Sequence, residues 1–198
     1  MEEIAEQRLI IDIDLAPNVD DVYTGKCLVA NSEIVMLLNF DEEDGEFDGF
    51  TIVKNSDVEK YRNWEEEDYT ELKNDNSESL IANIELNKFR DLESSMRNLI
   101  SKFVAIFTYD DEDTFFVGKV VSVTNDSVEL YLVDEDSKWT DIEVIKFSDQ
   151  WVTDYNYHRP HDSLEGISPV NYKIKKEKTV EGLRSATATP SPHSALQL

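Results

Sequence analysis

"YTGKCLVANSEIVMLLNFDEEDGEFDGFTIVKNSDV", residues 23–58, returns in altered form at residues 116–149 as "FVGKVVSVTNDSVELYLVDEDSKWTDIEVIKFSD". Gly25 and Lys26 align with Gly118 and Lys119 at an offset of 93 positions, and after a one-residue gap Lys54 aligns with Lys146. Upstream, "LIIDID" at 9–14 stands opposite "KFVAIF" at 102–107. The repeat predicts that the chain contains one small structural unit twice.

Each copy consists of short β-branched and aromatic runs separated by Asp, Asn, Ser and Gly, which is typical of antiparallel strands joined by tight turns. In the second copy four strands are predicted, at "FVAIFTY", "TFFVGKVVSVTN", "SVELYLVD" and "TDIEVIKF". Gly118 within a strand predicts a bend or bulge. This order of elements resembles the SH3-like and Sm-like small barrels. We therefore expect a mainly β fold with two tandem small β-barrels and a connecting helix, followed by a short helix and a disordered tail.

The segment "LNKFRDLESSMRNLISKF", residues 86–103, carries apolar residues at spacings of three and four, which predicts a helix packed on a barrel. These residues are Leu86, Phe89, Leu92, Met96, Leu99 and Ile100. The N-terminal "EEIAEQRL" is expected to be a short helix at the corresponding place in the first copy. The acidic "NWEEEDYTELK", residues 63–73, is predicted to be either a short helix or a loose strap.

Charge divides the chain near residue 150. Residues 1–149 contain 13 basic and 38 acidic side chains, a net of −25, whereas the remainder contains 6 and 5, a net of +1. Such a change in composition indicates a boundary. The predicted organisation is a first barrel (1–73), a linker (74–85), a helix with the second barrel (86–149), a C-terminal fragment (150–172) and a disordered tail (173–198).

The charge of the first 149 residues argues against binding to nucleic acid, because carboxylates repel phosphates. Only Lys26 and Lys119 are candidates for a basic face. The expected partner is a basic protein. One version of this expectation is that the chain neutralises its partner by charge, as immunity proteins of bacterial toxin systems often do, and a housekeeping interaction module is equally compatible. Candidate partner-binding residues are Tyr61, Trp64 and Tyr69, because aromatic side chains anchor many interfaces. Alternatively, Tyr61 and Trp64 cover the end of the first barrel.

No catalytic residue, cofactor or metal site is predicted, so the protein is not expected to be an enzyme. No histidine precedes residue 150, and we find no nucleophile beside a base. "DEEDGEFDG", residues 41–49, differs in ligand spacing from an EF-hand loop, and a solvated hairpin is preferred to a calcium site. The single cysteine, Cys27, excludes an internal disulfide and is expected in the core. Neither a signal peptide nor a membrane span is found, so a cytoplasmic location is expected.

"WVTDYNYHRPHDSLEGISPVNY", residues 151–172, resembles the C-terminal segment of insertion-sequence transposases with a retroviral-integrase-like core. The matching residues are Tyr155, Asn156, Arg159, Pro160, His161, Leu164, Ser168, Pro169 and Tyr172. The resemblance implies DNA integration by a ribonuclease-H-like domain with three metal-binding carboxylates. None of those carboxylates can be assigned here, because the repeated β pattern stands where that domain would lie.

The junction near residue 150 suggests a history for the chain. The transposase-like sequence begins within two residues of Asp149, where the second copy of the repeat ends. Our hypothesis is that a mobile element inserted into the gene, so that the acidic protein lost its own ending and gained a transposase fragment. A final barrel strand would then be missing, with a helix around Trp151 to Tyr157 covering the sheet edge. The alternative is a protein of DNA integration that binds DNA through the tail, and a metal pair at His158 and His161 is a minor alternative.

Overall fold

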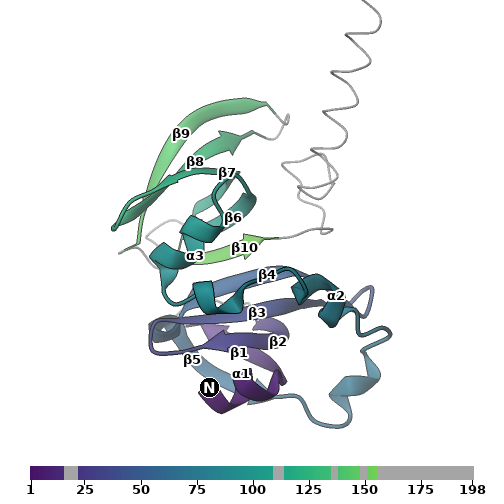
Figure 1. The fold of residues 1–198 in the computed structure, drawn as a ribbon. Coiled ribbons are helices and arrows are strands. Elements are labelled where there is room, and N and C mark those ends of the chain that lie inside the picture. The colour runs from purple at the N-terminus through teal and green to yellow at the C-terminus, as the bar shows by residue number, and fades with distance from the viewer. Residues whose placement is uncertain (16–21, 109–113, 135–137, 148–150, 156–198) are drawn as a thin grey trace, which may run out of the picture.

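The structure is a computed structural model, and it describes residues 1–15, 22–108, 114–134, 138–147 and 151–155. The expected mainly β fold with two small β units is confirmed. Within these described ranges, ten strands form one antiparallel sheet in the order β5-β1-β2-β3-β4-β10-β6-β7-β8-β9 (Figure 1). Strands β1 to β5 make the first unit, and β6 to β10 make the second.

The bounds of the elements follow the repeat. The strands of the first unit are β1 (Ile10–Leu15), β2 (Val22–Ala30), β3 (Ile34–Asp41), β4 (Glu46–Lys54) and β5 (Val58–Asn63). Those of the second are β6 (Phe103–Thr108), β7 (Thr114–Val123), β8 (Ser127–Val133), β9 (Trp139–Lys146) and β10 (Trp151–Tyr155). The helical elements are α1 (Glu2–Gln7), η1 (Asn55–Asp57), η2 (Asp68–Thr70), α2 (Ser77–Ile81), η3 (Leu86–Lys88) and α3 (Leu92–Asn98).

The strand registers of the two units coincide at the offset of 93. Lys26 pairs with Leu38 between β2 and β3, and Lys119 pairs with Tyr131 between β7 and β8. Each of these pairings shifts by one residue, directly after Cys27 in β2 and directly after Val120 in β7. A bulge conserved in place within both units increases strand twist at the same point of each sheet. The sequence repeat is therefore a repeat of the backbone.

The adjacent strand passes so close to Gly25 and to Gly118 that both positions require glycine. A Cβ atom on Gly25 would lie 2.4 Å from the carbonyl oxygen of Leu38, and one on Gly118 would lie 2.6 Å from that of Tyr131. Both neighbours are backbone atoms of the adjacent strand, so no side-chain rotation relieves the clash. The prediction of a bend or bulge near Gly118 is confirmed, since β7 shifts its register two residues later.

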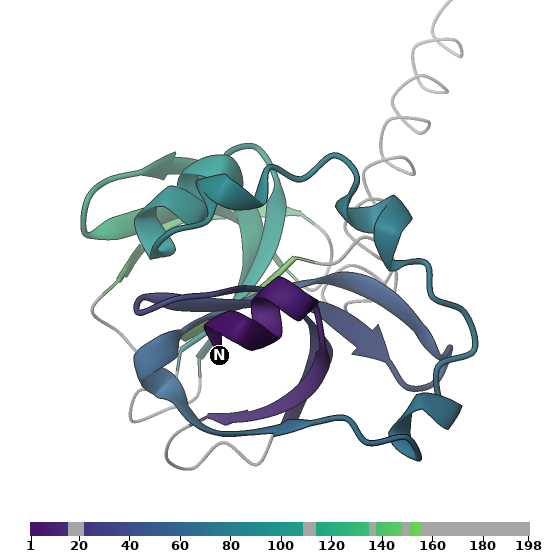
Figure 2. The ribbon, with the colours of Figure 1, turned by 60° about the horizontal axis from the view of Figure 1, so that its bottom comes forward.

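Each unit begins with the same helix-to-strand connection. α1 ends at Arg8 (φ 51°), and the turn after α3 passes through Ser101 (φ 69°), 93 positions later. The next carbonyls, of Leu9 and Lys102, accept hydrogen bonds of 2.9 Å from the corresponding amides of β2 and β7. The expected N-terminal helix is thus confirmed as α1, which lies against the curved strands of the first unit (Figure 2).

The connecting helix is shorter than its apolar spacing predicted. The side chain of Asp91 accepts a hydrogen bond of 2.6 Å from the Ser94 amide and forms a capping box, which starts α3 at Leu92. Leu86 lies in the separate η3, and the side chain of Ile100 is 43% exposed. The extended backbone at Asp91 interrupts the periodicity, so including Leu86 and Ile100 in one helical stripe was wrong.

β10 corrects the expectation for residues 151–157. Trp151–Tyr155 form a strand rather than a helix, and the closing strand of the second unit is present. Thr153 pairs with Ile106 of β6, as Tyr61 of β5 pairs with Ile13 of β1, so β10 takes the place of β5 in the second unit. The second unit therefore extends to Tyr155, beyond the boundary placed at residue 149.

β10 also joins the two units, because its other edge pairs with β4 of the first unit. Buried side chains continue across this junction, from Met36 and Ile52 through Met96 of α3 to Ile106 and Leu130. A second buried cluster, around Ile13, Leu37 and Cys27, fills the concave side of the first unit under α1. Among the described residues, no helix has the length and apolar character needed to cross a membrane.

Candidate partner-binding site

The segment 64–73, which we call the strap, follows β5 and crosses the end of the first unit. At its start the Trp64 amide donates to the carbonyl of Ile10 over 3.0 Å. The half-buried Trp64 ring packs edge to face on Phe40, with 4.9 Å between ring centroids, and its indole N–H donates to Asp12 over 3.0 Å. Trp64 therefore covers the end of the first unit and anchors the strap there.

The three candidate aromatic residues do not form one cluster. Tyr69 packs edge to face on Trp64, with 5.5 Å between centroids, and its side chain is 42% exposed. Tyr61 lies on β5 and is 49% exposed. The structure thus brings Trp64 and Tyr69 together, with Tyr69 as the exposed member, and places Tyr61 on an edge strand.

Arg62 ties the strap to the sheet. Its guanidinium donates to the carboxylate of Asp12 over 2.5 Å and to that of Asp68 over 2.6 Å. The hydrogen bond from Arg62, aided by one of 2.7 Å from the Glu65 amide, lowers the pKa of Asp68. The same two carboxylates raise the pKa of Arg62, with Asp68 as the larger cause. Asp12 was the sequence signal for this network, because a carboxylate inside the apolar "LIIDID" needs a partner.

The other end of the strap is fixed to the turn between β3 and β4. The amides of Lys73 and Asn74 both donate to the carbonyl of Gly45, over 2.8 and 3.2 Å. The Lys73 ammonium donates to the carbonyl of Glu43 over 2.7 Å. Gly45 has φ +67°, and a Cβ there would meet the Glu71 carbonyl oxygen at 2.6 Å. The turn and the strap are therefore in direct contact, which the sequence did not indicate.

The turn itself is a hairpin held by its first residue. The Asp41 carboxylate accepts hydrogen bonds from the Glu43 and Asp44 amides, over 2.9 and 3.2 Å. Among the described residues, no group of three or more His, Cys, Asp or Glu side chains is placed to hold a metal ion. The segment 41–49 thus forms a hairpin, of which Glu42, Glu43 and Asp44 are exposed whereas Phe47 and Asp48 are buried.

Contact between turn and strap gathers exposed carboxylates into what we call the acidic face. Its members are Glu42, Glu43, Asp44, Glu65, Glu66, Glu67 and Glu71, all with exposed side chains. The two cations nearest to them in the sequence are already engaged, Lys73 with a backbone carbonyl and Arg62 with Asp12 and Asp68. The turn carboxylates thus lie beside the end of the strap, and the other members flank the exposed Tyr69 in the sequence.

Lys26 does not contribute a basic face. Its ammonium donates to Asp75 over 2.9 Å and to Ser77 over 2.6 Å, and it lies 5.0 Å from the centroid of the Phe47 ring. Partial burial raises the pKa of Asp75, but hydrogen bonds from Ser77 and Lys26 outweigh it, and the net shift is downward. Lys26 therefore fastens the segment before α2 to the first unit.

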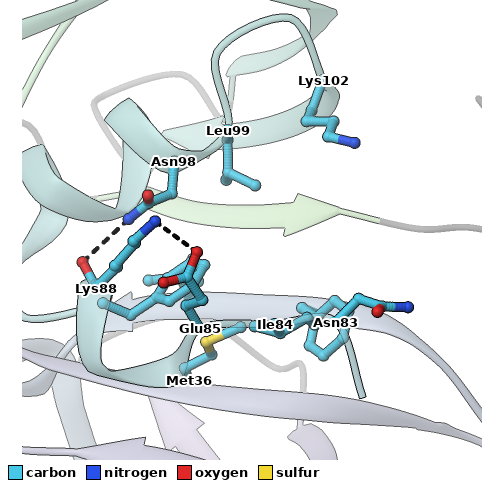
Figure 3. Close-up of a pocket in the computed structure, with 11 residues that line it drawn as sticks. Met36, Asn83, Ile84, Glu85, Lys88, Asn98, Leu99 and Lys102 are labelled. Carbon is cyan, nitrogen blue, oxygen red and sulfur yellow. Dashed lines mark hydrogen bonds and ion pairs between the residues drawn. The ribbon is translucent and has the colours of Figure 1, made fainter. Parts of the chain in front are cut away.

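A pocket of about 270 Å³ lies between the first unit and residues 74–102, which link the strap to β6 and which we call the connecting segment (Figure 3). Apolar side chains of β3, of β4 and of the turn after α3 line it, including Met36, Ile52 and Leu99. At its mouth the Lys88 ammonium pairs with Glu85 over 2.6 Å, and the Asn98 side chain donates to the Lys88 carbonyl over 3.1 Å. These polar groups satisfy one another, and the lining contains no nucleophile beside a base.

The remaining candidate groups lie in the core or beyond the described residues. Cys27 is a free, buried thiol, as expected, and burial raises its pKa to about 12. Tyr155 of the transposase-like motif is the last residue of β10. The other motif positions lie outside the described residues: Asn156, Arg159, Pro160, His161, Leu164, Ser168, Pro169 and Tyr172. His158 and the predicted disordered tail, 173–198, also lie outside them.

Comparison of the chain with protein-family models, with curated proteins and with solved structures found no match.

Proposed function

We propose that this chain is a non-catalytic binding protein whose acidic face holds and neutralises a basic protein partner. The observation that carries the proposal is the contact between the β3–β4 turn and the strap. It adds the exposed carboxylates of the turn to those of the strap, while Lys73 and Arg62 are engaged internally. Tyr69 offers an aromatic anchor beside this charged surface, and tyrosine is enriched among the residues that contribute most to binding at interfaces.

Charge would act mainly on the rate of association. Exposed carboxylates of one sign attract a basic partner over about a Debye length, roughly 10 Å at 0.1 M salt. Complementary charge raises the association rate and suppresses acidic or neutral partners. Binding at the acidic face should therefore weaken steeply with added salt.

We further propose that the two units are SH3-like or Sm-like barrels and that the protein acts in the cytoplasm. A binding role is compatible with small barrels, whose loops and edges commonly present recognition surfaces. The buried free thiol of Cys27 suits a reducing compartment. In this proposal, residues 150–172 are a truncated transposase C-terminus fused to the acidic protein.

The test compares two variants with identical changes in charge. Capture from a cell lysate on the full chain, at about 50 and 500 mM salt, supplies the candidate partner, and calorimetry then measures its affinity. Replacing Glu65, Glu66 and Glu67 with Gln should raise the dissociation constant at least tenfold, that is by about 1.4 kcal/mol or more. The matched control replaces Glu2, Glu3 and Glu6 of α1 and should change it less than about threefold.

Tyr69→Ala should also weaken the complex, because removal of a central aromatic anchor typically costs about 1 kcal/mol or more. Equal effects of the strap and α1 variants would show that net charge alone attracts cationic proteins, and would refute a site at the acidic face. A complex that is insensitive to salt would refute the electrostatic mechanism.

A second candidate function is DNA integration, and the transposase-like motif in 151–172 is the observation that favours it. It requires DNA affinity and strand transfer dependent on a divalent metal ion. Incubating the full chain with labelled DNA ends and Mg²⁺ or Mn²⁺ tests it directly. Strand-transfer products would replace the binding proposal with this one.

A further inference from the structure

Both ends of the sheet are open strands in the part of the chain that the structure describes. β5 pairs only with β1, and β9 pairs only with β8 (Figure 1). Both carry exposed apolar side chains: Tyr61 on β5 at 49%, and Ile142 and Val144 on β9 at 55% and 51%. Proteins usually shorten, charge or cover such edges, because unpaired backbone groups recruit further strands.

The β10–β4 junction within the chain shows how two such edges can pair. β10 and β4 pair antiparallel at the junction of the units, with Thr153 opposite Ile52. β10 is the counterpart of β5, as its pairing with β6 shows. β4 is likewise the counterpart of β9, because Ile52 pairs with Met36 exactly as Val144 pairs with Glu129, 93 positions after Met36.

We propose that β5 of one copy of this chain pairs antiparallel with β9 of a second copy, repeating between chains the β10–β4 junction within the chain. The repeat dictates the register. Transferring the printed pairs of the internal junction places Tyr61 opposite Val144 and Arg62 opposite Glu143 of the second copy. The flanking pairs are Lys60 with Ile145 and Asn63 with Ile142.

The side chains agree with this register. Tyr61 opposite Val144 is an aromatic residue facing a β-branched one, and Arg62 opposite Glu143 is a pair of opposite charges, two kinds of cross-strand pair that stabilise sheets. β5 brings Lys60 and Arg62 to the contact, in a chain whose net charge is −24. At this contact Lys60 and Arg62, the latter also paired with Asp12 and Asp68, face an edge that carries Asp141 and Glu143.

Two side chains of β4 are buried at the internal junction, whereas the equivalent side chains of β9 are more than half exposed. Ile52 of β4 is 1% exposed, because the connecting segment and the second unit cover it, whereas its counterpart Val144 is 51% exposed. α3 contacts β4 at the internal junction. In the proposed contact α1 of the first copy, which supplies β5 and is the counterpart of α3, would lie against β9 of the second copy and cover part of this surface.

The proposed contact is head-to-tail, since it uses a different edge on each copy. A dimer would leave one β5 and one β9 open, so association would continue until the copies close on themselves or form a filament. The assembly should strengthen with added salt, because salt screens the repulsion between two chains of charge −24. Binding of a basic protein at the acidic face should weaken with salt, so either proposal can fail without the other.

The first test measures the mass of the full chain by sedimentation at about 1 to 100 μM, the range of weak to moderate association. Species larger than one chain are expected to grow with concentration. Ile142→Lys with Val144→Lys should leave single chains at every concentration, with an unchanged circular dichroism spectrum. The control carries the same added charge at two exposed apolar residues away from both edges, Ile100→Lys with Val121→Lys, and should still assemble.

The second test checks the register with disulfides. A chain with Tyr61→Cys mixed with a chain with Val144→Cys should give an inter-chain disulfide under mild oxidation, because directly opposed residues fall within bonding distance. A mixture of Tyr61→Cys and Ile142→Cys, two positions out of register, should give at most about a tenth as much. Single chains at all concentrations, assembly that survives the β9 substitutions, or equal cross-linking in both mixtures would each overturn the proposal.

Discussion

The outward faces of β4 and β9 show how one backbone pattern can carry two different surfaces. Both strands occupy the fourth position of their units, in the same register to the third strand. Phe50 and Ile52 of β4 are buried under the connecting segment, whereas their counterparts Ile142 and Val144 are more than half exposed. The bulge, the glycine and the turns set the path of the chain. The segments that pack against each strand determine which of its side chains are buried.

The largest expected effect tests whether the two cores are equally important to stability. Leu37 and Leu130 are counterparts and both are fully buried. Leu37→Ala and Leu130→Ala should each lower the free energy of unfolding by about 3 kcal/mol, because each leaves a cavity. Urea denaturation followed by circular dichroism measures both, and Tyr131→Ala, at a 37% exposed neighbour, is the control. A loss below about 1 kcal/mol for Leu130→Ala alone would mean that the second core is loosely packed.

Glycine substitutions test the shared backbone. Gly25→Ala and Gly118→Ala should each cost about 1–3 kcal/mol, since the added Cβ would press on a backbone carbonyl of the adjacent strand. Because β10 and the buried cluster join the units, both variants should lower one common unfolding transition. Two separate transitions, each sensitive to only one of the variants, would show instead that the units unfold independently.

Substitutions in the turns after β2 and β7 should reduce stability by smaller amounts, and by different amounts in the two units. The Asn31 side chain accepts from the Glu33 and Ile34 amides and also donates to the Arg90 carbonyl of another segment. The Thr124 hydroxyl accepts from the corresponding Asp126 and Ser127 amides and donates to the Asp126 carboxylate, so these bonds stay within its own turn. Asn31→Ala should therefore cost about 1–2 kcal/mol and Thr124→Ala about 0.5–1 kcal/mol. Thermal melting ranks them, and the reverse order would contradict the hydrogen-bond assignment.

The smallest effect concerns the strap, which the described part of the second unit lacks. The hydrogen bond from Arg62 holds the pKa of Asp68 below its ordinary value of 3.8. A carboxyl with a depressed folded-state pKa stabilises fully above its ordinary value and loses that contribution as the pH falls through the folded pKa. Trp64 fluorescence should therefore change on acidification below about pH 4. Asp68→Asn should show the altered signal already at neutral pH, and identical titrations of both proteins would contradict this role.

The sequence predicted the repeat, its hairpins, the bend near Gly118 and the buried Cys27, because turn residues and β-branched runs act locally. It did not predict β10. Trp151–Tyr155 were assigned to a helix from the transposase resemblance, although Trp, Val, Thr and Tyr all favour strands. The length of α3 was overestimated because the apolar spacing continues through Asp91, whose cap stops the helix.

The candidate site was only partly predictable. The composition identified an acidic strap and its aromatic residues, and the repeat aligned "LIIDID", which contains Asp12, with a predicted strand of the second copy. The contact between Gly45 and the strap joins residues about 30 positions apart through backbone hydrogen bonds, which have no side-chain signature. The pairing of exposed edges is likewise invisible until the registers of both units are known.

The reactivity of Cys27 can report how often the first unit opens. It is the only thiol in the chain, it is fully buried, and its pKa of about 12 leaves almost no thiolate at neutral pH. A thiol reagent can therefore modify the native protein only during excursions that expose β2. The ratio of the modification rate of the native protein to that of the denatured chain therefore reports how often the first unit opens at Cys27.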